Sequence, residues 1–253
     1  MSIRIVNGLG RGSGGRPEYT TGMTCVPLGD QAVLIYLPDE PAAVRFAAAV
    51  RSANPPWLQD VVPAYASVGV FFDADRIGLH AVMDWLQASR ERERPERRTP
   101  VAHAPGSPRT HRLPVCYELQ LDMARVCEHT GLTADDVIRL HTASEFTVYA
   151  VGFVAGFPYL GYLPAELCGV PRLESPRPRV EPGSVGLTGR QTGVYPVPRP
   201  GGWNLIGRTP LTIVDVADGF FPLRVGDRVR FDRIDEAEYR RLEGERLPAN
   251  GPA

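Results

Sequence analysis

The sequence predicts an α+β fold in two parts, a small N-terminal α/β sandwich domain followed by a β-rich domain of barrel or sandwich type. Strand and helix patterns alternate in residues 23–92, whereas short apolar runs separated by glycine and proline dominate residues 146–231. Residues 93–110 carry alternating charges followed by Pro, Ala, Gly and Ser, which is typical of a linker. The 253 residues are enough for two modest hydrophobic cores.

The N-terminal domain is predicted at residues 23–92, after a flexible Gly-, Ser- and Arg-rich tail at residues 1–22. Met23 directly precedes the first strand pattern, so the start is either Met1 or Met23. The order strand, strand, helix, strand, strand, helix predicts two helices on one face of an antiparallel sheet. The expected strands are residues 24–28, 32–37, a segment beginning at 61, and 67–72, and the expected helices are residues 41–50 and 77–87.

The second domain is predicted at residues 111–235, followed by a C-terminal helix and tail at residues 236–253. Thr133 is a good N-cap for a helix that runs to about His141, because acidic residues follow it in the first turn. Short strands separated by turn residues then continue to the end of the domain. The other early elements are expected at residues 113–117 (strand), 121–129 (helix) and 146–153 (strand).

Composition excludes several classes of function. The formal net charge of -1 argues against a general nucleic-acid binder, which needs a basic face. No apolar run approaches the roughly 20 residues that span a bilayer, and the N-terminus lacks the apolar region of a signal peptide, so a cytoplasmic protein is expected. The four cysteines form no C-x-x-C pair, and no metal cluster stands out, so we expect no metal site.

The chain contains no lysine, because all 28 basic residues are arginine. This excludes a Schiff-base lysine, a Walker-type phosphate lysine and a biotin carried on this polypeptide. Any anion that the protein binds must therefore be held by arginine, by backbone amides or by a partner.

Three blocks, at residues 152–163, 176–196 and 200–211, combine many glycines with proline and aromatic residues. Such loops suit rigid, preorganised binding, in which arginines hold a carboxylate or phosphate and glycine amides hold an oxyanion. The same composition also fits a glycine- and proline-rich barrel whose turns are simply satisfied. Composition leaves these two interpretations open.

These blocks read GFVAGFPYLGYL, PRPRVEPGSVGLTGRQTGVYP and PGGWNLIGRTPL. With PVCYE at 114–118 and GLTADDVIRLH at 131–141, they resemble the family of KipI, also called allophanate hydrolase subunit 1 or the B subunit of 5-oxoprolinase (PxpB). Ala155 departs from the proline of many members, and residues 118–120 depart from a commoner glycine-rich stretch.

The resemblance implies a cyclophilin-like β-barrel as the second domain and similarity to the carboxyltransferase region of urea carboxylase. It also implies two partners, a homologous C subunit (KipA, or allophanate hydrolase subunit 2-like) and a LamB-like A subunit. Together such subunits open 5-oxoproline to L-glutamate at the expense of ATP, and this chain alone is expected to be inactive. ATP belongs to the complex, and the resemblance does not say which of the subunits binds it.

Candidate site residues follow from these blocks. The expected anion contacts are Arg179, Arg190 and Arg208, with Thr192 and the amides of Gly186, Gly189 and Gly193 beside the substrate. Gln191 and Tyr195 are expected to orient the substrate in the catalytic site. His141 is a candidate general base or a helix C-terminal cap.

Three rival functions stay open. The first is a KipI-like inhibitor of a sensor histidine kinase, which acts through an exposed apolar patch. The second is a carboxyltransferase subunit of a urea-carboxylase or allophanate-type system, which acts on a biotin carried by another protein. The third is a cyclophilin-like scaffold without chemistry.

Overall fold

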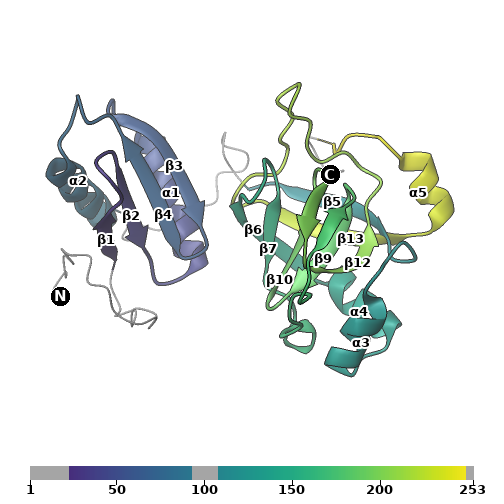
Figure 1. Cartoon of the computed structure of the whole chain (residues 1–253). Helices are drawn as coiled ribbons and strands as arrows, with labels where there is room; N and C mark the ends of the chain where they lie inside the picture. The colour runs from purple at the N-terminus through teal and green to yellow at the C-terminus, as the bar shows by residue number, and fades with distance from the viewer. Residues whose placement is uncertain (1–22, 93–107, 249–253) are drawn as a thin grey trace. The chain divides into compact units, whose positions relative to one another are not determined.

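The computed structural model describes residues 23–92 and 108–248, and of residues 89–92 only the backbone. The chain divides into two compact units, Met1–Ser107 and Pro108–Ala253, each of which is described by itself (Figure 1). The predicted tail at 1–22, residues 93–107 of the predicted linker and residues 249–253 lie outside the described residues.

The first unit is an antiparallel sheet with two helices, as the sequence predicts. Val68, Val70 and Phe72 alternate along one strand and are fully buried, so they share one face of the sheet. Both helices contribute to the same hydrophobic cluster as these residues and therefore cover that face. The sheet order is β1-β2-β4-β3, and the elements are β1 (Thr24–Pro27), β2 (Ala32–Tyr36), α1 (Glu40–Ala53), β3 (Leu58–Ala64), β4 (Ser67–Phe72) and α2 (Leu79–Arg92).

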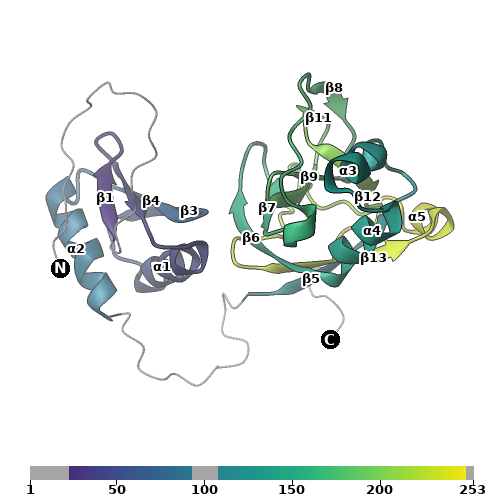
Figure 2. The same cartoon turned by 90° about the horizontal axis from the view of Figure 1, so that it is seen from below.

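The second unit is a closed seven-stranded barrel (Figure 2), so the barrel rather than the sandwich alternative is confirmed. Its strands follow the order β10-β7-β6-β13-β5-β12-β9, and β9 pairs with β10 to close it. A separate two-stranded sheet, β8 with β11, projects from the barrel. The barrel strands are β5 (Thr110–Cys116), β6 (Glu145–Val151), β7 (Pro158–Gly161), β9 (Ser184–Thr188), β10 (Gln191–Val194), β12 (Asn204–Arg208) and β13 (Arg228–Ile234), and the small sheet is β8 (Arg177–Val180) and β11 (Arg199–Gly201).

Three α-helices and one 3-10 turn accompany the barrel among the described residues. The N-cap at Thr133 is confirmed, because its side chain accepts a hydrogen bond from the amide of Asp136. Asp235 caps the last helix in the same way through the amide of Glu238. No helix in residues 23–92 or 108–248 is long and apolar enough to cross a bilayer. The elements are α3 (Met123–Thr130), α4 (Ala134–Ala143), η1 (Ala165–Leu167) and α5 (Glu236–Leu242).

The strand β5 begins at Thr110, one residue inside the predicted linker. It pairs in parallel with β13, from Thr110 opposite Arg228 to Cys116 opposite Ile234. The chain between these two strands forms the rest of the barrel, which supplies the long connection that a parallel pair requires. Pairing with a distant strand, rather than local composition, therefore places the boundary at this residue.

A buried carboxylate joins the starts of β5 and β13. Asp227 is 4% exposed, and its Oδ1 accepts a hydrogen bond from the amide of Arg109 at 3.0 Å. Its Oδ2 accepts from the amide of Arg224 at 2.9 Å and lies 3.2 Å from Nε2 of His111. Burial raises the pKa of Asp227, but the hydrogen bonds from His111 and the two amides outweigh it, so the pKa lies below its usual range.

We expect Asp227→Asn to lower the free energy of unfolding at pH 7 by about 1–3 kcal/mol, because one acceptor oxygen becomes a donor among donors. Chemical denaturation followed by circular dichroism measures this loss. Asp232→Asn is the matched control, since Asp232 pairs with Arg112 at the surface at 2.5 Å and its loss costs less than about 1 kcal/mol. Equal losses in the two variants would contradict the structural role of Asp227.

Candidate functional site

The three glycine-rich blocks form one continuous part of the barrel wall. Residues 152–163 end in β7, residues 176–196 contain β9 and β10, and residues 200–211 contain β12. In the closed barrel these strands are neighbours in the order β7-β10-β9-β12. The fold therefore brings together segments that the sequence separates by up to about fifty positions.

Two of the predicted site glycines lie at tightly packed positions of the barrel wall. A Cβ atom on Gly193 would lie 2.8 Å from the carbonyl oxygen of Pro158 and 3.0 Å from the ring of Trp203. A Cβ on Gly186 would lie 3.1 Å from Cβ of Trp203. These glycines lie opposite each other in the ladder between β9 and β10. They allow aromatic side chains and a neighbouring backbone to approach the barrel wall closely.

The backbone amides at these glycines do not form the expected oxyanion cradle. Strands β9 and β10 each have a paired neighbour on both sides, so the amides of Gly186 and Gly193 face other strands. The amide of Gly189, in the turn that follows β9, donates to the carbonyl oxygen of Val170 at 2.8 Å. These amides are therefore not available to hold an oxyanion, because barrel closure and the turn already use them.

His141 lies inside the barrel core and not at an open site. Its side chain is fully buried and stacks on Phe231, with ring centroids 4.5 Å apart. Nδ1 lies 2.8 Å from the hydroxyl of Tyr117, and Nε2 lies 3.0 Å from Oγ1 of Thr192. Thr192 is also fully buried and donates its hydroxyl proton to the carbonyl oxygen of Gly186 at 3.0 Å.

These contacts determine the tautomer of His141. Because the Thr192 hydroxyl donates to Gly186, its oxygen must accept from Nε2–H of His141. Nδ1 is then the acceptor for the hydroxyl of Tyr117. A neutral imidazole satisfies every polar side-chain atom in this series of hydrogen bonds, and burial lowers the pKa of His141 to about 3. The contacts join α4 to β5 and β10.

The aromatic residue Tyr195 belongs to a second, smaller cluster beside the β8–β11 sheet. It is 2% exposed, and its ring packs edge-on against Phe157 at 5.2 Å. Trp203 packs against the same Phe157 ring at 5.4 Å. Burial raises the pKa of the Tyr195 hydroxyl, against a weaker lowering by a hydrogen bond with the backbone of Trp203. Gln191 is half-buried at the start of β10.

The three predicted arginines do not converge on one cavity. Arg179 forms an exposed ion pair with Glu181 at 2.7 Å. Arg190 lies over the ring of Tyr162 at 4.2 Å, in the turn after β9. Arg208 pairs with Ser184 at the opposite end of β9. The register of β9 places Arg190 and Arg208 at its opposite ends, so the predicted anion contacts do not share one cavity.

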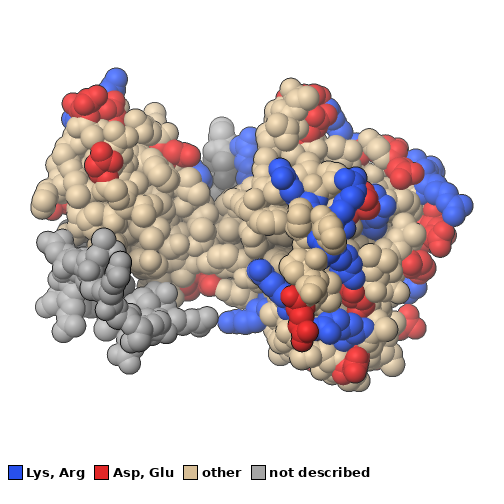
Figure 3. Space-filling model, viewed as in Figure 1, with Lys and Arg blue, Asp and Glu red and all other residues tan. Residues whose placement is uncertain are grey.

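The surface charges of the barrel unit are mixed. In the face shown in Figure 3, blue arginine side chains lie beside red acidic ones. Many charged side chains of this unit form ion pairs, such as Arg230 with Glu145 at 3.0 Å and Arg233 with Glu118 at 2.8 Å. Among the described residues, no group of three or more His, Cys, Asp or Glu side chains is placed to hold a metal ion.

Of the three arginines, Arg208 lines a cavity of about 160 Å³ in the barrel unit. Its Nε donates to the carbonyl oxygen of Pro182 at 2.9 Å, which fixes the plane of the guanidinium group. Within residues 23–92 and 108–248, no carboxylate lies within ion-pair distance of Arg208. The other lining residues are Pro182, Gly183, Pro196, Thr209, Pro210, Leu211, Thr212, Tyr239 and Glu243.

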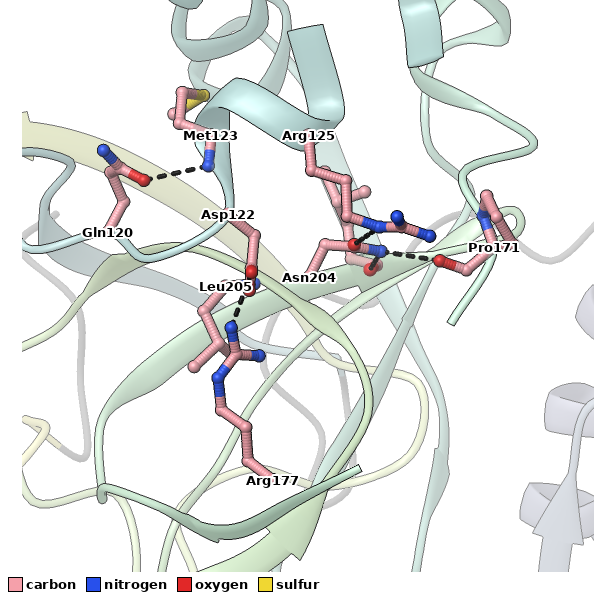
Figure 4. A network of polar contacts seen from close by, with 9 residues as sticks. Gln120, Asp122, Met123, Arg125, Pro171, Arg177, Asn204 and Leu205 are labelled. Atoms are coloured by element: carbon pink, nitrogen blue, oxygen red, sulfur yellow. Dashed lines mark hydrogen bonds and ion pairs between the residues drawn. The ribbon is translucent and has the colours of Figure 1, made fainter. Parts of the chain in front are cut away.

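A polar network that sequence analysis did not identify joins α3, β8 and β12 (Figure 4). Asp122 is 7% exposed and accepts from Nη2 of Arg177 at 2.6 Å and from the amide of Leu205 at 2.7 Å. The fully buried Asn204 accepts from Nε of Arg125 at 3.1 Å. The network attaches the small sheet and α3 to the barrel. Asp122 gave no signal in the sequence, because it lies outside the glycine-rich blocks.

We expect the free energy of unfolding to fall as the pH drops from about 6.5 to 5, by up to about 1.4 kcal/mol per pH unit from His141 alone. The unfolded histidine takes up a proton near pH 6.5, whereas the folded pKa is about 3. The stability contributed by the neutral form is therefore complete above pH 6.5 and is lost on acidification. Denaturant titrations at each pH measure the slope.

His141→Gln should reduce this slope, whereas His129→Gln, at an exposed position of α3, should leave it unchanged. A slope that is the same in all three proteins would show that His141 is not the group that resists protonation.

The chain matches known proteins over most of its length. The family model of the carboxyltransferase domain, subdomain C and D, matches residues 23–219. The B subunit of 5-oxoprolinase from Bacillus subtilis is 38% identical over 226 residues, which are 84% of this chain and 93% of that protein. The B subunit of 5-oxoprolinase from Escherichia coli O157:H7 is 51% identical over 111 residues, which are 44% of this chain and 50% of that relative.

A crystal structure of the protein TTHA0988 resembles the chain with a TM-score of 0.67 and 33% identity. The match covers 81% of this chain but 40% of that protein, so TTHA0988 contains a large additional region. The family match over residues 23–219 and the identity to the Bacillus subtilis protein show that this chain belongs to the family of the carboxyltransferase domain, subdomain C and D.

Proposed function

We propose that this chain is one component of an ATP-dependent 5-oxoprolinase, which opens 5-oxoproline to L-glutamate together with partner subunits. The observation that carries the proposal is the similarity to the B subunit of 5-oxoprolinase over nearly the whole Bacillus subtilis protein. The proposed partners are a homologous C subunit (KipA, or allophanate hydrolase subunit 2-like) and a LamB-like A subunit.

The cavity at Arg208 supports a substrate-binding role for this chain. A guanidinium group whose Nε is already held by a backbone carbonyl keeps its two terminal nitrogens in a fixed plane. That geometry matches the two oxygens of a carboxylate, which is the anionic group of 5-oxoproline. Arg208 therefore serves as the carboxylate contact in our proposal, whereas Arg179 and Arg190 lie at other places on the surface.

We assign positioning roles to the buried residues of the predicted site, which hold the strands β9 and β10 in place. His141 holds Thr192, and Thr192 holds the backbone of Gly186, so these contacts fix the register of β10 against β9. Tyr195 and Gln191 lie on or directly after the same strand and depend on that register. Because His141 is neutral and enclosed, we assign the general base to a partner.

ATP is proposed to bind to a partner. The cavity at Arg208 is about 160 Å³ and too small for a nucleoside triphosphate. A larger cavity of about 390 Å³ places a carboxylate, Glu128, beside Arg125 and His129, which does not suit a polyphosphate. The chain also lacks the lysine of a Walker-type phosphate loop. In this proposal the chain itself binds and orients the lactam.

We expect the purified chain to release no glutamate from 5-oxoproline, and the chain with both partners to release it only when ATP is present. A coupled glutamate assay on the co-expressed subunits measures this. Turnover by the chain alone would exclude the multi-subunit proposal. An inactive complex, with inhibition of a sensor histidine kinase or carboxyl transfer from biotin instead, would favour the corresponding rival function.

We expect Arg208→Ala to lower kcat/KM of the complex for 5-oxoproline by about 10- to 100-fold, because a charge-assisted hydrogen bond to the carboxylate is lost. Steady-state kinetics with the reconstituted complex measures the change. Arg112→Ala is the matched control, since Arg112 forms an exposed pair with Asp232 away from the cavity. A kcat/KM that is the same for both variants would remove Arg208 from the site.

A further inference from the structure

Part of the lining of the cavity at Arg208 comes from residues that lie beyond the match to the family model. Tyr239 and Glu243, from α5 and the position that follows it, both line the cavity. The match to the family model ends at residue 219, so α5 lies beyond it. Figure 1 shows α5, in yellow, beside the barrel strands.

Backbone contacts hold the end of α5 against the cavity. The amide of Gly244 donates to the carbonyl oxygen of Pro210 at 3.1 Å. The amide of Thr212 donates to the carbonyl oxygen of Glu245 at 2.8 Å. Pro210 and Thr212 are themselves lining residues, so Glu243 lies next to a segment that is fixed to the cavity wall.

Three side chains of the cavity, Arg208, Tyr239 and Glu243, keep polar atoms that the described residues do not bind. Tyr239 is 6% exposed, and its hydroxyl makes no hydrogen bond to the described residues. Glu243 makes no ion pair within the described part of the chain. Burial raises the pKa of Tyr239, with a lowering by Arg208 and a further raising by Glu243, so both charges act on the hydroxyl.

Glu181, a further acid near Arg208, is already paired with another arginine. The charge of Arg208 also acts on Glu181, whose pKa is lowered first by its hydrogen bond with Arg179. Both side-chain oxygens of Glu181 accept from Arg179, at 2.7 and 3.2 Å. Arg179 thus occupies the carboxylate that would otherwise compete for Arg208.

We propose that Arg208, Tyr239 and Glu243 form one binding site for a small lactam carboxylate. Arg208 binds the carboxylate, Glu243 accepts a hydrogen bond from the lactam N–H, and Tyr239 donates one to the lactam carbonyl oxygen. The inference rests on the proposed function and adds two residues from the α5 end of the chain to it. A cavity of about 160 Å³ holds on the order of five waters and so suits a ligand of few atoms.

The experiment uses the complex of the full chain with its partners and three substrates or competitors. These are L-5-oxoproline, 2-pyrrolidone, which lacks the carboxylate, and N-methyl-5-oxoproline, which lacks the lactam N–H. For Glu243→Ala and Tyr239→Phe we expect KM for L-5-oxoproline to rise about 10-fold or more, with kcat changed less than KM. Glu236→Ala, on the exposed side of the same helix, is the control and should keep the wild-type KM.

Selectivity separates a binding role from a structural one. The wild-type complex should bind N-methyl-5-oxoproline at least about 10-fold more weakly than L-5-oxoproline, and Glu243→Ala should abolish this difference. Arg208→Ala should abolish the preference for L-5-oxoproline over 2-pyrrolidone. The same variant should keep the preference for L-5-oxoproline over N-methyl-5-oxoproline. A merely destabilised chain would lose both preferences together or neither.

An active wild-type complex in which Glu243→Ala and Tyr239→Phe keep KM and both preferences would overturn the inference and leave the proposed function intact. An inactive wild-type complex would overturn the proposed function. In that case calorimetry of L-5-oxoproline with the full chain decides the inference. Saturable binding weakened about 10-fold by both variants would support it, and absent or unaffected binding would overturn it.

Discussion

Closure of the barrel through the β9–β10 pair is the constraint on which the rest of the second unit depends. It brings Gly186 and Gly193 opposite each other, where a side chain on Gly193 would meet the backbone of Pro158 and one on Gly186 would crowd Trp203. The same closure uses the amides of β9 and β10 for hydrogen bonds between strands. Glycine density in these blocks therefore reflects close packing, and the polar chemistry of the site has to come from side chains at the rim of the barrel.

Polar side chains in this unit fall into two groups that differ in whether their hydrogen bonds are already used. Tyr117, His141 and Thr192 form a buried series in which each donor has an acceptor, so it specifies the core without offering anything to a ligand. Arg208 and Tyr239, in contrast, keep donors that the described residues do not satisfy. Donors that line a cavity and keep no partner within the described residues are available to a ligand, so they are the better indicator of a binding site.

Local patterns predicted the elements well, since strand alternation and caps such as Thr133 depend on neighbouring residues alone. They did not predict which arginines meet, because the register of β9 places Arg208 and Arg190 at opposite ends of one strand. The burial of His141 could not be predicted from neighbouring residues either, since it depends on Phe231, ninety positions further along the chain. Tyr239 and Glu243 were missed because a short amphipathic helix at the end of the chain resembles an ordinary surface helix.

These distances and charges support a division of labour between the proteins of the proposed complex. A lactam is opened by stabilising charge on its carbonyl oxygen and by activating a water, and both steps need groups that change their protonation state or carry positive charge at the reacting atom. The enclosed imidazole of His141, with a pKa of about 3, does neither at neutral pH. The cavity at Arg208 instead offers one fixed cation, one hydroxyl and one carboxylate, which are groups that bind and orient. In the proposed function, the chain holds the lactam still while the reactive groups arrive from another chain, and its affinity for the lactam, rather than its own reactivity, sets its share of the rate.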